Sequence, residues 1–396
     1  MAENLLDQIT EITQVGAKHW SAFETVSPGG IPFSGYLCRQ ESDKFGLLAV
    51  TEQAGAPRLE FIYAMPKIDY PYIPQQDGSL RVVIDVHPGT VDARFTHKLD
   101  GTAIIFYPLT GPDGEILEVI PRTRLQPVLT PSRWGDWNAL LAAALPDRSG
   151  VEAAVRTERA VLIFELWGNR NAHLIRYDEP LKLTLHTARH LDGRLYPFPD
   201  VMALAEKYGL EVVKSVAVLT PDAAGLVAAY AQVQAEMEAR NQAAGEEVFV
   251  DEGVILALST AQTAVYLKCK PPSIEEIHWQ ADQHVSKAHI EQALFKLAEN
   301  NYDFDTGQVA DLYEKLESDF DREELEANAD LIERIFHDFR AEMRKQATLR
   351  DLLRTLIAQE NLDPTDLPGL MRHLSKHYAR SEMSWVFGVV KSLGGG

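Results

Sequence analysis

The chain has 396 residues, which is enough for two domains, and its 45% hydrophobic content and mean hydropathy of −0.17 are typical of a globular protein. No apolar run approaches the roughly 18 residues of a membrane span, and no apolar signal core follows the first residue, so we expect a cytoplasmic protein without membrane contact. The two cysteines, Cys38 and Cys269, are too few for a zinc site. The net charge of −20 excludes a uniformly basic surface for nucleic acid but leaves a local basic groove open.

Short apolar runs dominate the first quarter of the chain. Helical spacing of Leu5, Leu6 and Ile9 predicts a short N-terminal helix, and residues 45–50, 59–64 and 80–86 predict strands.

The segment 96–102, Thr-His-Lys-Leu-Asp-Gly-Thr, precedes an apolar strand at 103–107. A lysine is nucleophilic only when its amine is unprotonated, which a desolvated site or nearby cations favour. Lys98 lies two positions before Asp100, and Gly101 permits a tight backbone. The same pattern is also typical of an ordinary surface hairpin, so this segment alone decides nothing.

Beyond a turn at 111–114, residues 116–120 predict the returning strand. Arg122 and Arg124 follow it and would share one face if the strand continues past Pro121. Two exposed arginines are the alternative. Residues 132–145 predict a helix.

Glu165 ends a very apolar strand, 161–164, and precedes Trp-Gly-Asn-Arg at 167–170. A carboxylate in such a strand is costly unless something bonds it, although it could also face solvent at a strand edge. Two strands are predicted in 172–186, a strand at 212–219, and helices at 199–208 and 220–242.

Glu252 precedes Gly253 and a short strand, and Lys268 and Lys270 are spaced to share one strand face. A carboxylate near a nucleotide is a natural Mg²⁺ ligand because hard cations prefer oxygen. An exposed strand face is the alternative for the lysines.

After Pro271-Pro272 nearly every pattern is helical, so we expect an α+β domain over 1–270 and an all-α domain over 271–396. Residues 325–343, 349–357, 367–374 and 385–390 predict helices. The helical part carries many basic residues, which form either a solvated face or a face that contacts RNA. These are Arg340, Arg344, Lys345, Arg350, Arg354, Arg372, His373, Lys376, His377 and Arg380.

In order and content, the segments around Lys98, Glu165, Glu252 and Lys268 resemble the nucleotidyltransferase motifs of ATP-dependent nucleic-acid ligases and mRNA-capping enzymes. Over residues 30–275 the chain is most similar to the RNA ligases of phage RNA repair. The resemblance implies a nucleotidyltransferase domain with ATP-grasp-like antiparallel sheets and flanking helices.

The resemblance also implies roles. Lys98 would carry AMP, Asp100 would orient Lys98 or a metal-bound water, and Glu165 would recognise the nucleotide. Glu252 and Asp100 would hold Mg²⁺ or Mn²⁺. Five basic residues would contact ATP. Two of them, Lys268 and Lys270, would lie at the α-phosphate, where they would help to lower the pKa of Lys98. These contacts are Lys67, Arg122, Arg124, Lys268 and Lys270.

The implied substrates are RNA 3′-hydroxyl and 5′-phosphate ends, as in RNA repair or tRNA processing, with no obligate protein partner. A helical C-terminal part in place of an OB-fold favours an RNA ligase. A DNA ligase, a capping-type enzyme and a non-catalytic RNA-binding protein stay open. The adenine-stacking position has no Phe, Tyr or Trp. Leu183 or Leu185 would have to stack on the adenine, although we expect both in the core, and the ring of His186 is the only one nearby.

Overall fold

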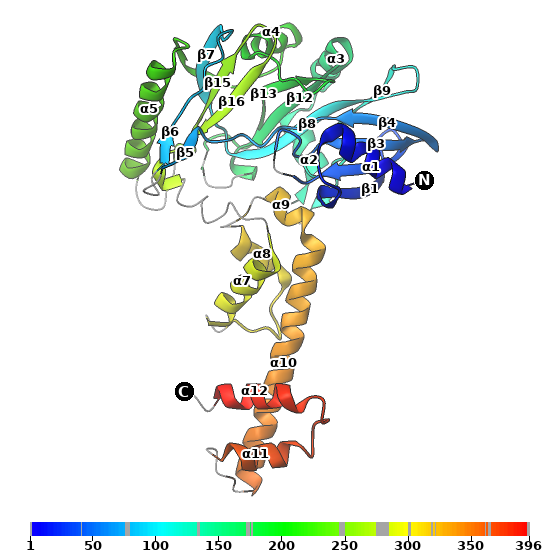
Figure 1. Cartoon of the computed structure of the whole chain (residues 1–396), viewed down its shortest axis with the longest axis vertical. Coiled ribbons are helices and arrows are strands. Elements are labelled where there is room, and N and C mark those ends of the chain that lie inside the picture. Colours follow the sequence, from blue (N-terminus) through cyan, green and yellow to red (C-terminus); the bar gives the residue numbers. More distant parts are fainter. Residues whose placement is uncertain are drawn as a thin grey trace. The chain divides into compact units, whose positions relative to one another are not determined.

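The computed structural model divides the chain into two compact units, residues 1–280 and 281–396 (Figure 1). The boundary predicted from sequence is 271. The residues that the structure describes are 2–40, 42–75, 80–132, 135–171, 175, 177–244, 250–274, 285–299, 302–317, 320, 322–360, 362 and 366–393.

The first unit begins with helix α1 (Ala2–Thr13), a short 3-10 turn η1 (Ala17–His19) and an antiparallel four-stranded sheet in the order β1-β2-β3-β4. Ile9 and Trp20 pack with Leu47 and Ala49 in a small core beneath this sheet. The strands are β1 (Trp20–Val26), β2 (Pro32–Cys38), β3 (Leu48–Gln53) and β4 (Ala56–Ile62).

A second antiparallel sheet has the order β13-β12-β8-β9. Its strands alternate little between polar and apolar residues because they are covered, and Ile104, Phe106, Leu162 and Phe164 are fully or almost fully buried. The strands are β8 (Gly101–Thr110), β9 (Ile116–Arg122), β12 (Ala160–Trp167) and β13 (Lys182–His190).

Three helices cover this second sheet, as Figure 1 shows for two of them, α3 and α4. Each of the three helices contributes buried residues to the main hydrophobic core of this sheet: Trp137 and Leu141 from α2, Val151 and Val155 from α3, and Val201 from α4. The helices are α2 (Trp137–Ala144), α3 (Ser149–Glu158) and α4 (Phe198–Tyr208).

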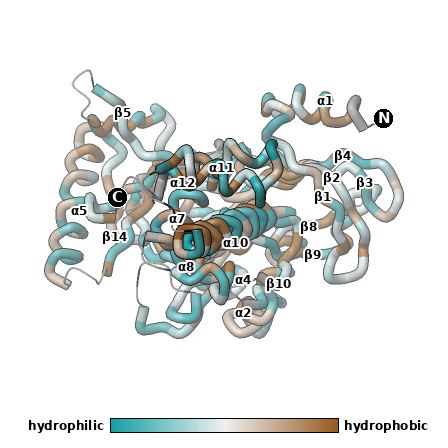
Figure 2. The backbone as a smooth tube through the Cα atoms, turned by 90° about the horizontal axis from the view of Figure 1, so that it is seen from below, coloured by the Kyte–Doolittle hydropathy of each residue, from teal (hydrophilic) through white to brown (hydrophobic). Residues whose placement is uncertain are grey.

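The third sheet has the order β14-β7-β15-β16 and is also antiparallel. Helix α5 (Ala223–Ala244) buries Leu226, Tyr230 and Met237 against it, and Figure 2 shows hydrophobic residues interspersed with hydrophilic ones along this helix. The strands are β7 (Asp92–His97), β14 (Ser215–Leu219), β15 (Val254–Ser259) and β16 (Ala264–Cys269), and four short ones form two further pairs: β5 (Tyr72–Pro74) with β6 (Leu80–Val82), and β10 (Pro131–Ser132) with β11 (Gly135–Asp136).

The second unit consists of helices in the described residues. Leu349 and Leu353 of the long helix α10 pack against Leu370, Leu374 and Val386 in one core. The helices are α7 (Lys287–Glu299), α8 (Val309–Leu316), α9 (Arg322–Ala327), α10 (Ala329–Glu360), α11 (Leu367–Leu374) and α12 (Met383–Leu393). Across the described parts of both units, no helix has the length and apolar content that crossing a membrane requires.

The predicted fold class, α+β with antiparallel sheets, flanking helices and a helical C-terminal part, is confirmed. Three details differ from the sequence prediction. Helix α3 and strands β1, β2 and β7 are additional. In the region 172–186 the structure describes the start of one strand, β13, while residues 172–174 and 176 lie outside the described residues. The helices predicted at 325–343 and 349–357 correspond to α9 and a continuous α10.

Candidate active site

Lys98 lies in the turn where the chain passes from the third sheet to the second. β7 ends at His97 and β8 begins at Gly101. Each sheet therefore carries its own neighbours to this turn: β12 pairs with β8, so that Glu165 lies opposite Ala103, and β15 pairs with β7, so that Val254 lies opposite His97. Leu99 packs into an apolar cluster with residues of β15 and β16, which anchors the turn.

Two glycines near Lys98 are required by close backbone contacts. A Cβ on Gly101 would lie 2.2 Å from the carbonyl oxygen of Leu166 in β12, and one on Gly253 would lie 2.5 Å from the carbonyl oxygen of Cys269. The carbonyl of Gly253 accepts a hydrogen bond from the amide of Lys98 at 3.0 Å. Glycine thus lets the turn press directly against strands of both sheets.

An ion cluster joins three of the predicted residues. The amine Nζ of Lys98 lies 2.5 and 2.6 Å from Oε1 and Oε2 of Glu252, and Nζ of Lys270 lies 3.0 Å from Oε1 of the same carboxylate. Glu252 and Lys270 are buried, with 3% and 5% of their side chains exposed, whereas Lys98 is 23% exposed. Of these three side chains, that of Lys98 is the most exposed as a whole.

The carboxylates control the charge of Lys98. Burial by itself lowers the pKa of the amine, but Glu252, with help from Glu165 and Asp100, outweighs it and raises the pKa above the ordinary lysine value. The sequence-based expectation of a lowered pKa is therefore wrong here, because the effect of the carboxylates, above all Glu252, exceeds that of burial. Lys98 is held here as a protonated ion-pair partner.

Asp100 is buried and is fixed by the segment that follows β12. Its Oδ2 accepts a hydrogen bond from the amide of Ile175 at 2.7 Å, and its own amide donates to the hydroxyl oxygen of Tyr177 at 2.7 Å. Burial raises the pKa of Tyr177, and the charges of Asp100, Glu252 and Glu165 raise it further, so its hydroxyl stays protonated. The sequence motifs gave no indication of Tyr177.

Glu165 faces His186 rather than solvent. Its Oε2 lies 3.6 Å from Nε2 of His186, which is the extra residue where the pairing of β12 and β13 shifts register between Ile163 and Phe164. Burial, with the nearby charges of Arg124 and Lys98, lowers the pKa of His186 to about 3, so the ring is neutral. The bulge turns this ring into the site.

The two leucines that precede His186 pack inward. Leu183 and Leu185 belong to the core of the second sheet, as predicted.

Lys268 is held by an aromatic ring. Its Nζ lies 4.4 Å from the ring centroid of Tyr70, which stacks on Tyr72 at 5.4 Å. The amide of Lys268 donates to the carbonyl of Asp69 at 2.9 Å, so the segment that contains Lys67 runs beside β16. Lys67 and Lys268 thus belong to adjoining stretches of backbone.

Arg122 is placed differently from what the sequence predicts for a nucleotide contact. Its side chain is fully buried, and its guanidinium donates at 2.8 Å to the carbonyls of Gly46 and Arg124. Arg124 is half-buried, with its guanidinium 5.2 Å from the ring of Phe45. The geometry gives Arg122 a structural role, and the charge of Arg124 acts on His186.

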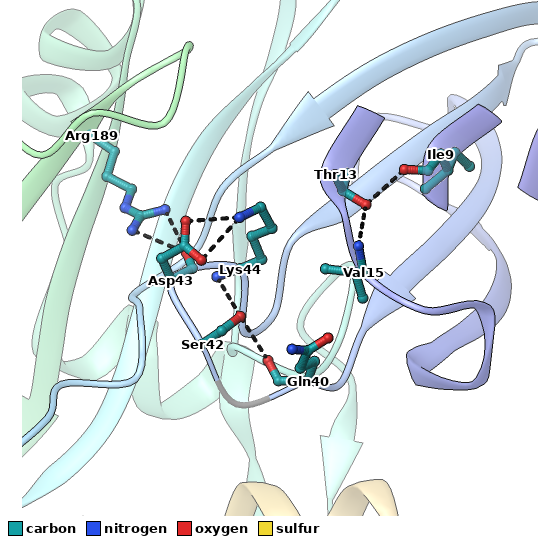
Figure 3. A network of polar contacts seen from close by, with 8 residues as sticks. All are labelled: Ile9, Thr13, Val15, Gln40, Ser42, Asp43, Lys44 and Arg189. Carbon is teal, nitrogen blue, oxygen red and sulfur yellow. Dashed lines mark hydrogen bonds and ion pairs between the residues drawn. The ribbon is translucent and has the colours of Figure 1, made fainter. Parts of the chain in front are cut away.

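The loop 42–46 links these parts, and Figure 3 shows one of its contacts, from Arg189 to Asp43. Its carbonyls accept hydrogen bonds from three different elements: Ser42 from the amide of Lys67 at 3.0 Å, Asp43 from the guanidinium of Arg189 at 3.2 Å, and Gly46 from Arg122. The first sheet is thereby tied to β9, to β13 and to the segment of Lys67.

Glu252 and Asp100 are buried carboxylates of the kind that can hold a divalent cation together with other ligands. The described residues include no group of three or more histidine, cysteine, aspartate or glutamate side chains suited to a metal. Mg²⁺ commonly binds through one or two carboxylates together with water and substrate phosphates. Glu252 and Asp100 supply that number of carboxylates, although both oxygens of Glu252 face Lys98 in this structure.

No protein-family model and no curated protein matches the chain. Among solved structures, an archaeal ATP-dependent RNA ligase has a TM-score of 0.47 at 17% identity, covering 81% of this chain and 80% of its own. A putative ATP-dependent DNA ligase from Aquifex aeolicus has a TM-score of 0.44 at 14% identity, covering 83% and 79%. An RNA ligase of Naegleria gruberi has a TM-score of 0.34 at 14% identity, covering 55% and 65%. All these TM-scores are below 0.5, so a function has to be argued from the site itself.

Proposed function

We propose that the protein is an ATP-dependent polynucleotide ligase that joins RNA ends through a lysyl-AMP intermediate on Lys98. The observation that carries this proposal is the ion cluster of Lys98, Glu252 and Lys270, because it joins three motif segments around one amine. Glu165 and Asp100 lie near enough to act on the same amine. This arrangement suits a nucleophile with its activating groups.

In the first step, the nitrogen lone pair of Lys98 forms a bond to the α-phosphorus of ATP while the bond to pyrophosphate breaks. The amine must first lose the proton that it carries in its ion pair, and Glu252 is the carboxylate in contact with it. Lys270 is buried beside that carboxylate, where it would balance charge that builds up on the phosphoryl oxygens.

Two carboxylates would hold a divalent cation, Mg²⁺ or Mn²⁺, which when bound supplies positive charge at the phosphates. We assign this role to Glu252 and Asp100. Glu165 would contact the nucleoside, and Lys67 and Lys268 would contact the phosphates from their adjoining segments. Arg124 stays a candidate for the nucleotide, whereas we assign Arg122 to the support of loop 42–46.

In the second step, the 5′-phosphate of a polynucleotide attacks the phosphorus of lysyl-AMP and releases Lys98. In the third step, a 3′-hydroxyl attacks the activated 5′-phosphate, forms the phosphodiester and releases AMP. The protein mainly orients these groups, which can supply a large part of the rate enhancement.

The helical second unit is the feature that favours RNA over DNA, because by family resemblance a strand-rich OB-fold accompanies DNA ligases and capping enzymes. A DNA ligase is the second candidate, and a capping-type enzyme is the third.

The test uses the full chain with labelled ATP or GTP and Mg²⁺, followed by single-stranded RNA, nicked duplex RNA or nicked DNA, each with a 5′-phosphate. We expect label on the protein from ATP alone and its transfer to RNA. Label from GTP would indicate a capping-type enzyme, and transfer only to nicked DNA would indicate a DNA ligase. A protein that never takes up label would be non-catalytic.

A further inference from the structure

The chain doubles back over the Lys98 turn after β12. The amide of Asn169 donates to the carbonyl of Glu179, and the amide of Arg170 donates to that of Pro180, both at 2.9 Å, which closes the segment into a loop. Within it, the amide of Tyr177 donates to Oδ1 of Asn169 at 3.0 Å. Tyr177 is thus placed by its own backbone.

The ring of Tyr177 is fixed as well. It meets the indole of Trp167 edge-on, with 4.7 Å between ring centroids, and the indole Nε1 donates to Oγ1 of Thr184 at 2.8 Å. The Trp167 ring also has a cation near it, since Nζ of Lys182 lies 5.8 Å from its centroid. The position of the Tyr177 hydroxyl is therefore set by packing and by neighbouring bonds.

The Tyr177 hydroxyl has a hydrogen that it does not donate to any of the described residues. Its oxygen accepts the hydrogen bond from the amide of Asp100, but a tyrosine hydroxyl also carries one hydrogen of its own. Within the described part of the chain, no acceptor is hydrogen-bonded to it. The half-buried hydroxyl lies within electrostatic reach of Asp100, Glu252 and Glu165, the acids that surround Lys98.

We propose that Tyr177 is a nucleotide-binding residue, whose hydroxyl donates a hydrogen bond to an oxygen of the ribonucleoside triphosphate while its oxygen holds the amide of Asp100. This inference rests on the proposed function, because it places the nucleotide beside Lys98. The hydroxyl is one hydrogen bond from the backbone amide of Asp100, which follows Lys98 by two residues in the same turn. The acceptor is either a ribose oxygen or a phosphate oxygen.

The variant Tyr177→Phe removes only the hydroxyl and keeps the ring on Trp167. We expect the KM for ATP in lysyl-AMP formation to rise about five- to tenfold, as loss of one hydrogen bond predicts, with a smaller change in kcat. Tyr208→Phe is the matched control, because it removes a half-buried hydroxyl at the end of α4 that donates to Glu158 of α3 at 2.7 Å. Its kinetics should equal those of the wild type.

A purely structural role predicts another result: a lower melting temperature and a lower kcat for Tyr177→Phe, with the KM for ATP unchanged. That result would overturn the inference. Comparing ATP with 2′-deoxy-ATP shows whether the acceptor is the 2′-oxygen, since the two losses overlap in that case and multiply if the acceptor is any other oxygen. If wild type forms no adduct, the proposed function itself fails and this inference falls with it, whereas a normal wild-type adduct with an unchanged variant rejects the role of Tyr177 alone.

Discussion

The buried carboxylate of Glu252 neutralises two lysines, Lys98 and Lys270. We therefore expect substitution of Glu252 to reduce stability more than substitution of any other residue of the site. Glu252→Gln would leave Lys98 and the buried Lys270 without their common partner. Breaking a buried ion pair from one side costs about 3–5 kcal/mol of unfolding free energy, because a charge is left uncompensated. Denaturant unfolding without ATP or metal measures it.

The neighbouring variant Asp251→Asn is the control. Asp251 pairs with Arg240, which is 52% exposed, and surface pairs contribute about 1 kcal/mol or less. Equal losses from both variants would show that Glu252 is not the counter-ion of a buried cluster.

His186 predicts a dependence of stability on pH. Its pKa is about 3 in the folded protein and about 6.5 when unfolded. Below pH 6.5 the unfolded chain takes up a proton that the folded protein does not, so stability falls as pH is lowered toward 3, by at most about 1.4 kcal/mol per pH unit. Stability should therefore fall less steeply with decreasing pH in His186→Gln than in the wild type.

Denaturant unfolding at pH 4.5 and pH 7 checks this, with His97→Gln, which replaces an exposed histidine, as the control. The same difference between the two pH values in wild type and His186→Gln would contradict the account.

At the scale of elements, the close approach of β8 and β12 is what sets the Lys98 turn. Gly101→Ala would place a methyl group 2.2 Å from the carbonyl oxygen of Leu166, so the strands must separate. We expect a loss of about 2 kcal/mol or more and a large fall in adduct formation.

Gly114→Ala is the matched control for this element. Its Cβ would meet nothing within 4 Å, and only its φ of +76° is unfavourable, which costs about 1 kcal/mol. Thermal unfolding of both variants measures the difference. If Gly101→Ala is as stable and as active as Gly114→Ala, close packing of these strands does not position Lys98.

Much of this architecture could be predicted from sequence because long apolar runs such as β8 and β12 are unambiguous. Strand β7 could not be predicted, because Asp92, Arg94 and His97 interrupt the apolar pattern of a strand that lies inside its sheet. α3 is short and polar and buries only Val151, Ala154 and Val155.

For the site, motif order predicted the meeting of Lys98 with Glu252 and Lys270. The sequence indicates the ring of His186 near the adenine, but not the register shift that places it against Glu165 or the returning loop that places Tyr177.

At the scale of the whole molecule, all proposed site residues lie in the unit of residues 1–280. In the second unit, some predicted RNA-facing cations contact acids instead: Arg344 pairs with Asp305 at 2.6 Å and Lys345 with Glu382 at 3.5 Å. Arg372, Lys376 and Arg380 are exposed.

The fragment 1–280 should therefore still form lysyl-AMP, at a rate within a few-fold of the full chain, as labelled ATP would measure. A folded fragment that takes up no label would show that the second unit contributes to the first step.

The most direct test of the whole account is peptide mass spectrometry after incubation with ATP and Mg²⁺, comparing wild type with Lys98→Ala and with Lys287→Ala, which replaces a lysine that is 71% exposed in the second unit. The account predicts one AMP adduct, on the peptide that contains Lys98, in wild type and Lys287→Ala, and none in Lys98→Ala. An adduct that persists in Lys98→Ala, or that maps to another residue, would contradict it.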